Sequence, residues 1–156
     1  MSGRIPKRQH TVKSDEAFRA FVVQVFRLNG MLTAAGDALA APAGQTSARW
    51  RVLAAVEDTP MTVAHIARAW SLARQSVQRV ADLLEKDGLV AYEDNPAHRR
   101  ASLVRLTPEG RAALRRIQKA QRSWTKAVGD AIGADDLETA GAILKRVMDA
   151  VDTVSP

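Results

Sequence analysis

The chain has 156 residues, no cysteine and a formal net charge of +6, from 23 basic and 17 acidic side chains. Its length favours one domain with a packed core, and the missing cysteine excludes disulfides, thiolate metal sites and thiol redox switches. No apolar run reaches the roughly 18–20 residues of a membrane span, and no signal-peptide pattern follows the basic N-terminus, so we expect a cytoplasmic protein without a membrane partner.

The first segments are a basic arm and two helices. Residues 1–13 carry four basic side chains, no acid and no hydrophobic periodicity, which predicts a flexible basic arm. Ser14 is a good N-cap residue, and apolar residues at three-and-four spacing predict an amphipathic helix over residues 14–41. Thr46 is the expected N-cap of a second helix, which ends before residues 58–60.

A helix-turn-helix pattern comes next, followed by a hairpin. Thr62 is the expected N-cap of a short third helix, and the turn of residues 71–74 leads to a fourth helix that Gly88 ends. Residues 89–93 and 103–106 are aliphatic or β-branched, and the turn-rich residues 95–100 lie between them, which predicts a β-hairpin.

Two further helices complete the predicted order. Thr107 and Pro108 provide a cap and a first helical residue for a long helix that extends to about residue 132. Gly133 ends it, and Asp135 and Asp136 begin the last helix. The predicted fold is therefore mainly α with a small β-hairpin, in which a winged helix-turn-helix is flanked by N- and C-terminal helices.

The fourth helix has a surface suited to reading DNA. The second helix of such a pair can enter a major groove, where arginine bridges guanine, glutamine bridges adenine and serine contacts either base. Acidic residues occur only later in this helix. The outward residues near its start, which are the candidate DNA-reading residues, are Arg74, Gln75, Ser76, Gln78 and Arg79.

Six ordered segments resemble the MarR (multiple antibiotic resistance regulator) family of bacterial transcription factors over nearly the whole chain. They are residues 46–53 (TSARWRVL), 62–67 (TVAHIA), 74–80 (RQSVQRV), 84–90 (LEKDGLV), 95–101 (NPAHRRA) and 106–111 (LTPEGR). The resemblance implies one MarR-type domain over residues 14–156. Its winged helix-turn-helix covers about residues 46–110, and its dimerisation helices cover about residues 14–41 and 111–153.

The resemblance also implies a mode of action. Family members are homodimers that place the recognition helix in a major groove and the wing tip in the flanking minor groove. They usually repress nearby genes from a palindromic operator, and many release DNA when a small, often aromatic or phenolic, ligand binds. No cofactor is implied. The expected function is a DNA-binding transcriptional regulator acting as a homodimer on double-stranded DNA.

The wing residues matching the family pattern are His98, Arg99 and Arg100. In the family the tip commonly reads Asp-x-Arg, and the aspartate steadies an arginine that enters the minor groove. Arg100 retains that arginine, since narrow A·T-rich minor grooves attract it. His98 departs from the pattern and either contacts a phosphate or is a loop histidine without a role. Ala73 departs too, because a capping serine is common there.

Two further groups of residues follow from the resemblance. Large groups on elements that surround a crevice in the family are candidates for a ligand pocket, although the tryptophans could equally fill the core: Trp50, His65, Trp70 and Trp124. The apolar faces of the first and last helices supply the expected dimerisation residues: Phe18, Phe21, Val22, Val25, Leu144, Val147 and Val151. The isolated histidines make a metal site improbable.

Three other classes of protein are weighed against a regulator. No phosphate loop, metalloprotease motif or nucleophile-base pair is present, which argues against an enzyme. A winged-helix protein-interaction module needs no arginine and glutamine array. A nucleoid-type protein shares the charge but binds DNA without sequence preference.

Overall fold

The computed structural model describes residues 13–154. The predicted basic arm, residues 1–13, lies outside this range except for Lys13. The elements in chain order are α1 (Ser14–Ala40), η1 (Ala41–Ala43), α2 (Ser47–Ala55), β1 (Met61–Thr62), α3 (Val63–Ala69), α4 (Arg74–Lys86), β2 (Val90–Glu93), β3 (Leu103–Leu106), α5 (Pro108–Ile132) and α6 (Ala134–Val154). The chain is thus mainly α with a small antiparallel sheet, as predicted.

Side-chain caps begin three of the helices as predicted. Thr46, Thr62 and Thr107 each accept a hydrogen bond from the backbone N–H three residues later. The prediction for Ser14 is wrong, because Ser14 is the first helical residue and Lys13 is an N-cap without a side-chain bond. Serine and two acids occur together at this helix start, and the helix takes one more residue than the capping pattern indicates.

The sheet has three strands rather than the predicted two. Its order is β1-β3-β2, and Met61 pairs with Val104 while Val90 pairs with Leu106. β1 has only two residues and no periodicity of its own, so only its pairing with β3 defines it. This pairing joins the start of α3 to the base of the hairpin.

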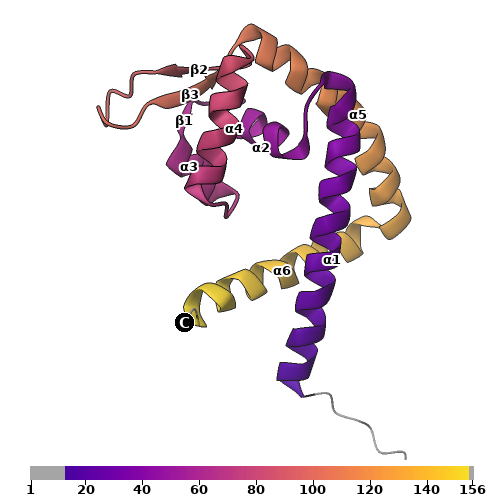
Figure 1. The fold of residues 1–156 in the computed structure, drawn as a ribbon. Coiled ribbons are helices and arrows are strands. Elements are labelled where there is room, and N and C mark those ends of the chain that lie inside the picture. The colour runs from indigo at the N-terminus through magenta and orange to yellow at the C-terminus, as the bar shows by residue number, and fades with distance from the viewer. Residues whose placement is uncertain (1–12, 155–156) are drawn as a thin grey trace, which may run out of the picture.

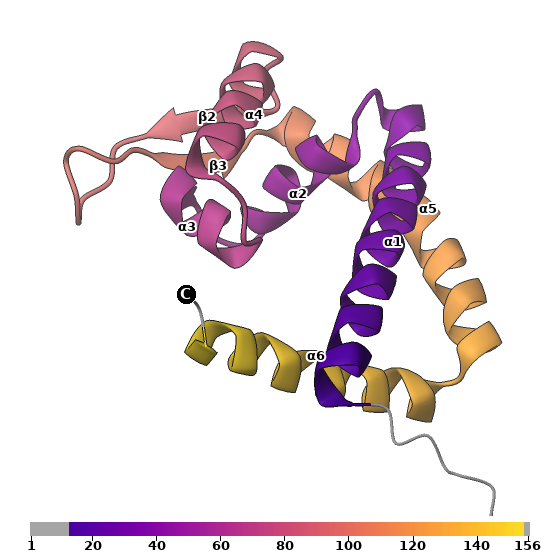
Figure 2. The ribbon, with the colours of Figure 1, turned by 60° about the horizontal axis from the view of Figure 1, so that its bottom comes forward.

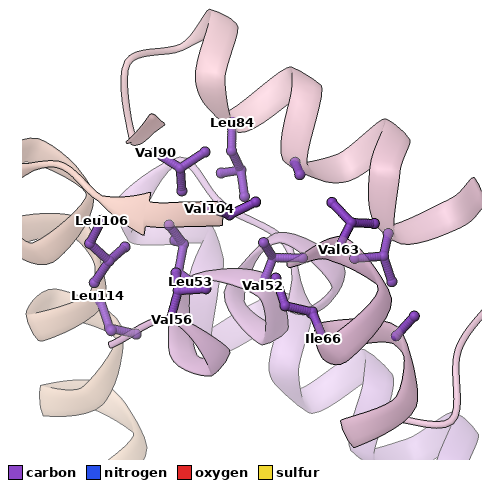
Figure 3. Close-up of a cluster of buried hydrophobic side chains, with 13 residues drawn as sticks. Val52, Leu53, Val56, Val63, Ile66, Leu84, Val90, Val104, Leu106 and Leu114 are labelled. Carbon is purple, nitrogen blue, oxygen red and sulfur yellow. The ribbon is translucent and has the colours of Figure 1, made fainter. Parts of the chain in front are cut away.

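The core lies where α2, α3, α4 and the sheet meet, as Figure 3 shows. Leu53, Ile66, Leu84 and Val104 are completely buried there. Burying side chains of this size is worth about 1.5–3 kcal/mol each. This core fixes the orientation of α4 relative to the hairpin, and both project from one side of the molecule (Figure 1).

The start of α5 is fixed against the junction between α4 and β2. The hydroxyl of Thr107 donates to the carbonyl of Gly88 at 2.7 Å, and the backbone N–H of Thr107 donates to the carbonyl of Leu89 at 3.2 Å. A Cβ on Gly110 would lie 1.8 Å from the carbonyl oxygen of Leu89. Only glycine allows this close approach, which connects the base of the hairpin to the long helix.

The long helices α1, α5 and α6 lie away from the hairpin (Figures 1 and 2). Much of their apolar surface is exposed in the single chain, including Phe26, Met31 and Met148. None of the helices among residues 13–154 is both long and apolar enough to cross a membrane.

The junction between α1 and α2 is sensitive to pH. Asp37 lies at the N-terminus of α2, and its carboxylate accepts the backbone N–H of Ser47 at 2.7 Å. Backbone and side-chain hydrogen bonds from Ser47 hold the pKa of Asp37 below its ordinary value of 3.8, and the charge of Arg51 lowers it further, while desolvation opposes them. A carboxylate beside a helix N-terminus is also favoured by the helix dipole.

We expect Asp37→Asn to lower the free energy of unfolding at neutral pH. Because the folded-state pKa is depressed, this stabilisation is present above the ordinary pKa and is lost as pH falls through the folded-state value. Urea unfolding of wild type and variant across a pH series measures it, and the difference between them should shrink in acid. A difference that stays constant from neutral to acidic pH contradicts this assignment.

Candidate nucleic-acid interface

The helix-turn-helix presents the start of α4 to solvent. Val77, Ala81 and Leu84 face the core and are buried. The opposite face carries the five predicted DNA-reading residues, four of which are exposed, while Gln78 is half-buried. Ala73 is the N-cap of α4 and makes no side-chain bond, so the expected departure from a capping serine is present.

The turn before α4 contains one residue in the left-handed region. Ser71 has a φ of 50°, and its backbone N–H donates to the carbonyl of Arg68 at 3.2 Å. The backbone N–H of Leu72 donates to the carbonyl of Ala67 at 2.8 Å. These bonds close the end of α3 and direct the chain into α4, as a tight helix-turn-helix requires.

Gln78 belongs to a hydrogen-bond network that the sequence did not predict. Its Nε2 donates to Asp82 Oδ1 and to the Tyr92 hydroxyl, both at 2.8 Å. The Tyr92 hydroxyl donates to the same Asp82 oxygen at 2.7 Å. Burial and the carboxylate of Asp82 raise the pKa of Tyr92 above its ordinary value, so the hydroxyl stays protonated at neutral pH. The network connects the recognition helix to strand β2.

The wing is the loop between β2 and β3, and it extends away from the core (Figures 1 and 2). At its base, Arg105 Nε lies 3.0 Å from Glu93 Oε2, which joins the two strands across the hairpin. At its tip, the His98 backbone N–H donates to the carbonyl of Asn95 at 3.2 Å, and the Ala101 N–H donates to the carbonyl of His98 at 3.0 Å. The tip is therefore a turn organised by backbone bonds.

The three predicted wing residues, His98, Arg99 and Arg100, are all exposed. Within the described part of the chain no ion pair holds Arg100, and the acidic partner that the family places two residues before it is replaced by His98. The guanidinium of Arg100 is thus available to a partner outside this chain.

A hollow of about 310 Å³ lies between α3, α4 and the wing. Its lining brings together Arg74, Gln78 and Arg100, although these residues are up to 26 positions apart in the sequence. The remaining lining residues are Thr62, Val63, Ala64, Tyr92, Ala101 and Ser102. Two arginines and an amide beside one hollow are the groups expected to face phosphates and base edges.

The candidate ligand-pocket residues are only partly gathered. Trp50 and Trp70 line one pocket of about 560 Å³ between α1, α2 and α5, together with polar groups such as Arg51. His65 and Trp124 are not among its lining residues. His65 is exposed on α3, where its backbone N–H donates to the Thr62 hydroxyl, and Trp124 is half-buried on α5.

Three of the expected dimerisation residues line a second hollow, of about 780 Å³: Phe18, Val147 and Val151. Phe21 and Val22 are half-buried, while Val25 and Leu144 are exposed. The apolar residues of α1 and α6 are therefore mostly accessible in a single chain. No group of three or more potential metal-ligating side chains occurs among residues 13–154.

Comparisons with known proteins agree on one family. A model of the MarR family matches residues 43–101. The uncharacterized protein Rv2011c of Mycobacterium tuberculosis is 37% identical over 92% of this chain and 99% of its own length. The crystal structure of Sco5413, a MarR family transcriptional regulator from Streptomyces coelicolor, has a TM-score of 0.74 at 22% identity, covering 90% of this chain and 99% of that one.

A structure determined with DNA is also similar. The transcriptional regulator MosR of M. tuberculosis, in complex with DNA, has a TM-score of 0.69 at 25% identity, covering 83% of this chain and 96% of that one. The architecture, the family model and these relatives agree with the sequence resemblance. The chain belongs to the MarR family, whose winged helix-turn-helix proteins are DNA-binding transcription regulators and not enzymes.

Proposed function

We propose that this chain is a homodimeric, sequence-specific regulator that acts on a pseudo-palindromic operator and represses nearby genes. The observation that carries the proposal is the joint presence of Arg74, Gln78 and Arg100 around one hollow between the recognition helix and the wing. A module that only binds proteins has no need for this array. The family relationship and the MosR complex with DNA support the same direction of argument.

Each of the two elements has a defined part in the proposed complex. Arg74 and Arg79 are exposed near the start of α4, where an arginine can bridge guanine O6 and N7. Arg100 lies at the wing, at the place from which it would enter the flanking minor groove. Arg99 and His98 are exposed beside it and are proposed to contact phosphates.

The exposed apolar surface supports the proposed dimer. Phe26, Met31 and Met148 are between 63% and 72% exposed, and they lie on the long helices rather than on the winged core. Soluble monomers seldom expose a continuous apolar surface of this kind. A two-fold pairing of α1 and α6 would cover it, and would set two copies of α4 about one DNA turn apart.

A small effector is the least constrained part of the proposal. The pocket between α1, α2 and α5 combines Trp50 and Trp70 with Arg51 and Glu57, so an aromatic compound with a polar group suits it. Ligand binding there would change DNA affinity through the helices that connect the two parts of the chain. Titration of aromatic acids and phenols, with tryptophan fluorescence and operator affinity as readouts, tests this role. It is rejected if compounds that change the fluorescence leave the affinity unchanged.

Selection of bound DNA from random duplexes tests the proposed function. We expect a pseudo-palindrome whose half-sites are about one helical turn apart, bound by two chains per duplex. Sequencing of the selected pool gives the site, and analytical ultracentrifugation gives the stoichiometry. A pool without any enriched sequence would indicate a nucleoid-type protein, and a protein that retains no duplex would indicate a protein-interaction module.

A further inference from the structure

The closed network of Gln78, Asp82 and Tyr92 determines what Gln78 can offer to a base. Its Nε2 donates 2.8 Å bonds to both partners, and the Tyr92 hydroxyl donates a 2.7 Å bond to the Asp82 oxygen that Gln78 also contacts. The three side chains form a ring of hydrogen bonds between α4 and β2. This ring lies at the edge of the hollow that Arg74 and Arg100 also line.

Chemistry alone sets the orientation of the Gln78 amide. A carboxylate at neutral pH only accepts hydrogen bonds, so the group that faces Asp82 must be the NH₂ of Gln78 and not its oxygen. The Tyr92 hydroxyl uses its proton on Asp82, and it therefore receives Gln78 through a lone pair. Turning the amide over would place oxygen against oxygen at both contacts.

Both N–H groups of Gln78 are consequently engaged within the protein. Among residues 13–154 no hydrogen bond is made to its Oε1. A bidentate contact with adenine needs an N–H donor for N7 and an oxygen acceptor for the N6 amino group. Gln78 retains the acceptor and has no free donor.

We propose that Gln78 reads a single base amino group through Oε1, either adenine N6 or cytosine N4, and that Asp82 and Tyr92 are its positioning residues. This inference rests on the proposed function, because it assumes that α4 enters a major groove. It revises the expectation from the sequence that the glutamines of this helix bridge both groups of adenine. It also makes Tyr92, a strand residue next to the wing, a determinant of sequence preference.

Base analogues in the selected operator test the proposal directly. The relevant base pair is the one at which Gln78→Ala loses its preference. If the base is adenine, replacing it with purine, which lacks the amino group, should weaken wild-type binding about tenfold, the value of roughly one charge-free hydrogen bond. Replacing it with 7-deazaadenine, which lacks N7, should change the affinity less than twofold. If the base is cytosine, the matching analogue is 2-pyrimidinone. In the Gln78→Ala protein the amino group should no longer matter.

Tyr92→Phe tests the positioning role. It keeps the ring and removes only the hydroxyl, so we expect an unchanged melting temperature and salt dependence but about fivefold less discrimination at this base pair. Asp82→Asn, which no longer presents an obligatory acceptor, should have the same effect. Adding Tyr92→Phe to Gln78→Ala should cause no further loss, whereas adding it to Gln75→Ala, the control on the same helix, should give independent effects.

Two results would overturn the inference. One is a loss on 7-deazaadenine as large as the loss on purine, which would mean that Gln78 also donates to N7. The other is full discrimination by both Tyr92→Phe and Asp82→Asn. A wild-type protein that selects no site contradicts the proposed function as a whole, whereas either of these results, obtained with a selected site, contradicts this inference alone.

Discussion

Gly110→Ala is expected to destabilise the protein by about 3 kcal/mol or more, the upper range for overpacking a site that cannot yield. The new Cβ would lie 1.8 Å from the carbonyl oxygen and 2.9 Å from the carbonyl carbon of Leu89. Both are backbone atoms, so a side-chain rotation cannot relieve the contact. Either α5 or the junction between α4 and β2 must move, and the hydrogen bonds of Thr107 to that junction would be lost with it.

Urea unfolding of the variant measures this loss. The matched control is Gly129→Ala in the same helix, where a Cβ meets no atom within 4 Å. There we expect unchanged or slightly increased stability, since alanine is the better helix former by about 0.5–1 kcal/mol. Equal unfolding midpoints for Gly110→Ala and wild type would show that α5 does not pack against Leu89 in this way.

Arg100→Ala is expected to weaken operator binding about tenfold when the flanks are A·T-rich, and less when they are G·C-rich. Arg100 is exposed at the wing and has no ionic partner in the described chain, so its charge is available for the minor groove. Losing the contact should also reduce the slope of log affinity against log salt by about one.

The appropriate control removes the same charge elsewhere. Arg122→Ala, at an exposed position of α5, gives the same change in net charge and should leave the flank preference unchanged. Titrations of both variants at several salt concentrations, on operators with the two kinds of flank, separate a local contact from a general charge effect. If both variants lose affinity equally and without regard to the flanks, Arg100 has no specific place in the complex.

Local signals explain why most of the fold was predictable. Thr46, Thr62 and Thr107 each precede a helix and cap it through their own hydroxyl, so a few neighbouring residues define each helix start. Pro108 at the first helical position and Gly133 after the last reinforce the bounds of α5. Such signals need no knowledge of distant parts of the chain.

The features that sequence missed all depend on distant partners. β1 is a strand only because Met61 pairs with Val104, which lies 43 positions later. The bonds between Gln78 and Tyr92 join a helix to a strand 14 positions away. No periodicity or spacing carries this information.

The candidate ligand residues show the same limit. Trp50 and Trp70 come together because α2 packs beside the end of α3, and His65 and Trp124 remain apart from them. Residue type identified large groups that could line a crevice, while packing decides which of them share one. The site on α4 was more predictable, because its residues are neighbours on one helix and need only the correct face to be exposed.

The most direct test of the central claim is the affinity of the wild-type protein for its selected duplex and for a scrambled duplex of the same composition, measured at physiological salt. A sequence-specific regulator should bind the selected duplex at least about 10³-fold more tightly, the lower range for specific protein–DNA complexes. Equal affinities for the two duplexes would contradict the account.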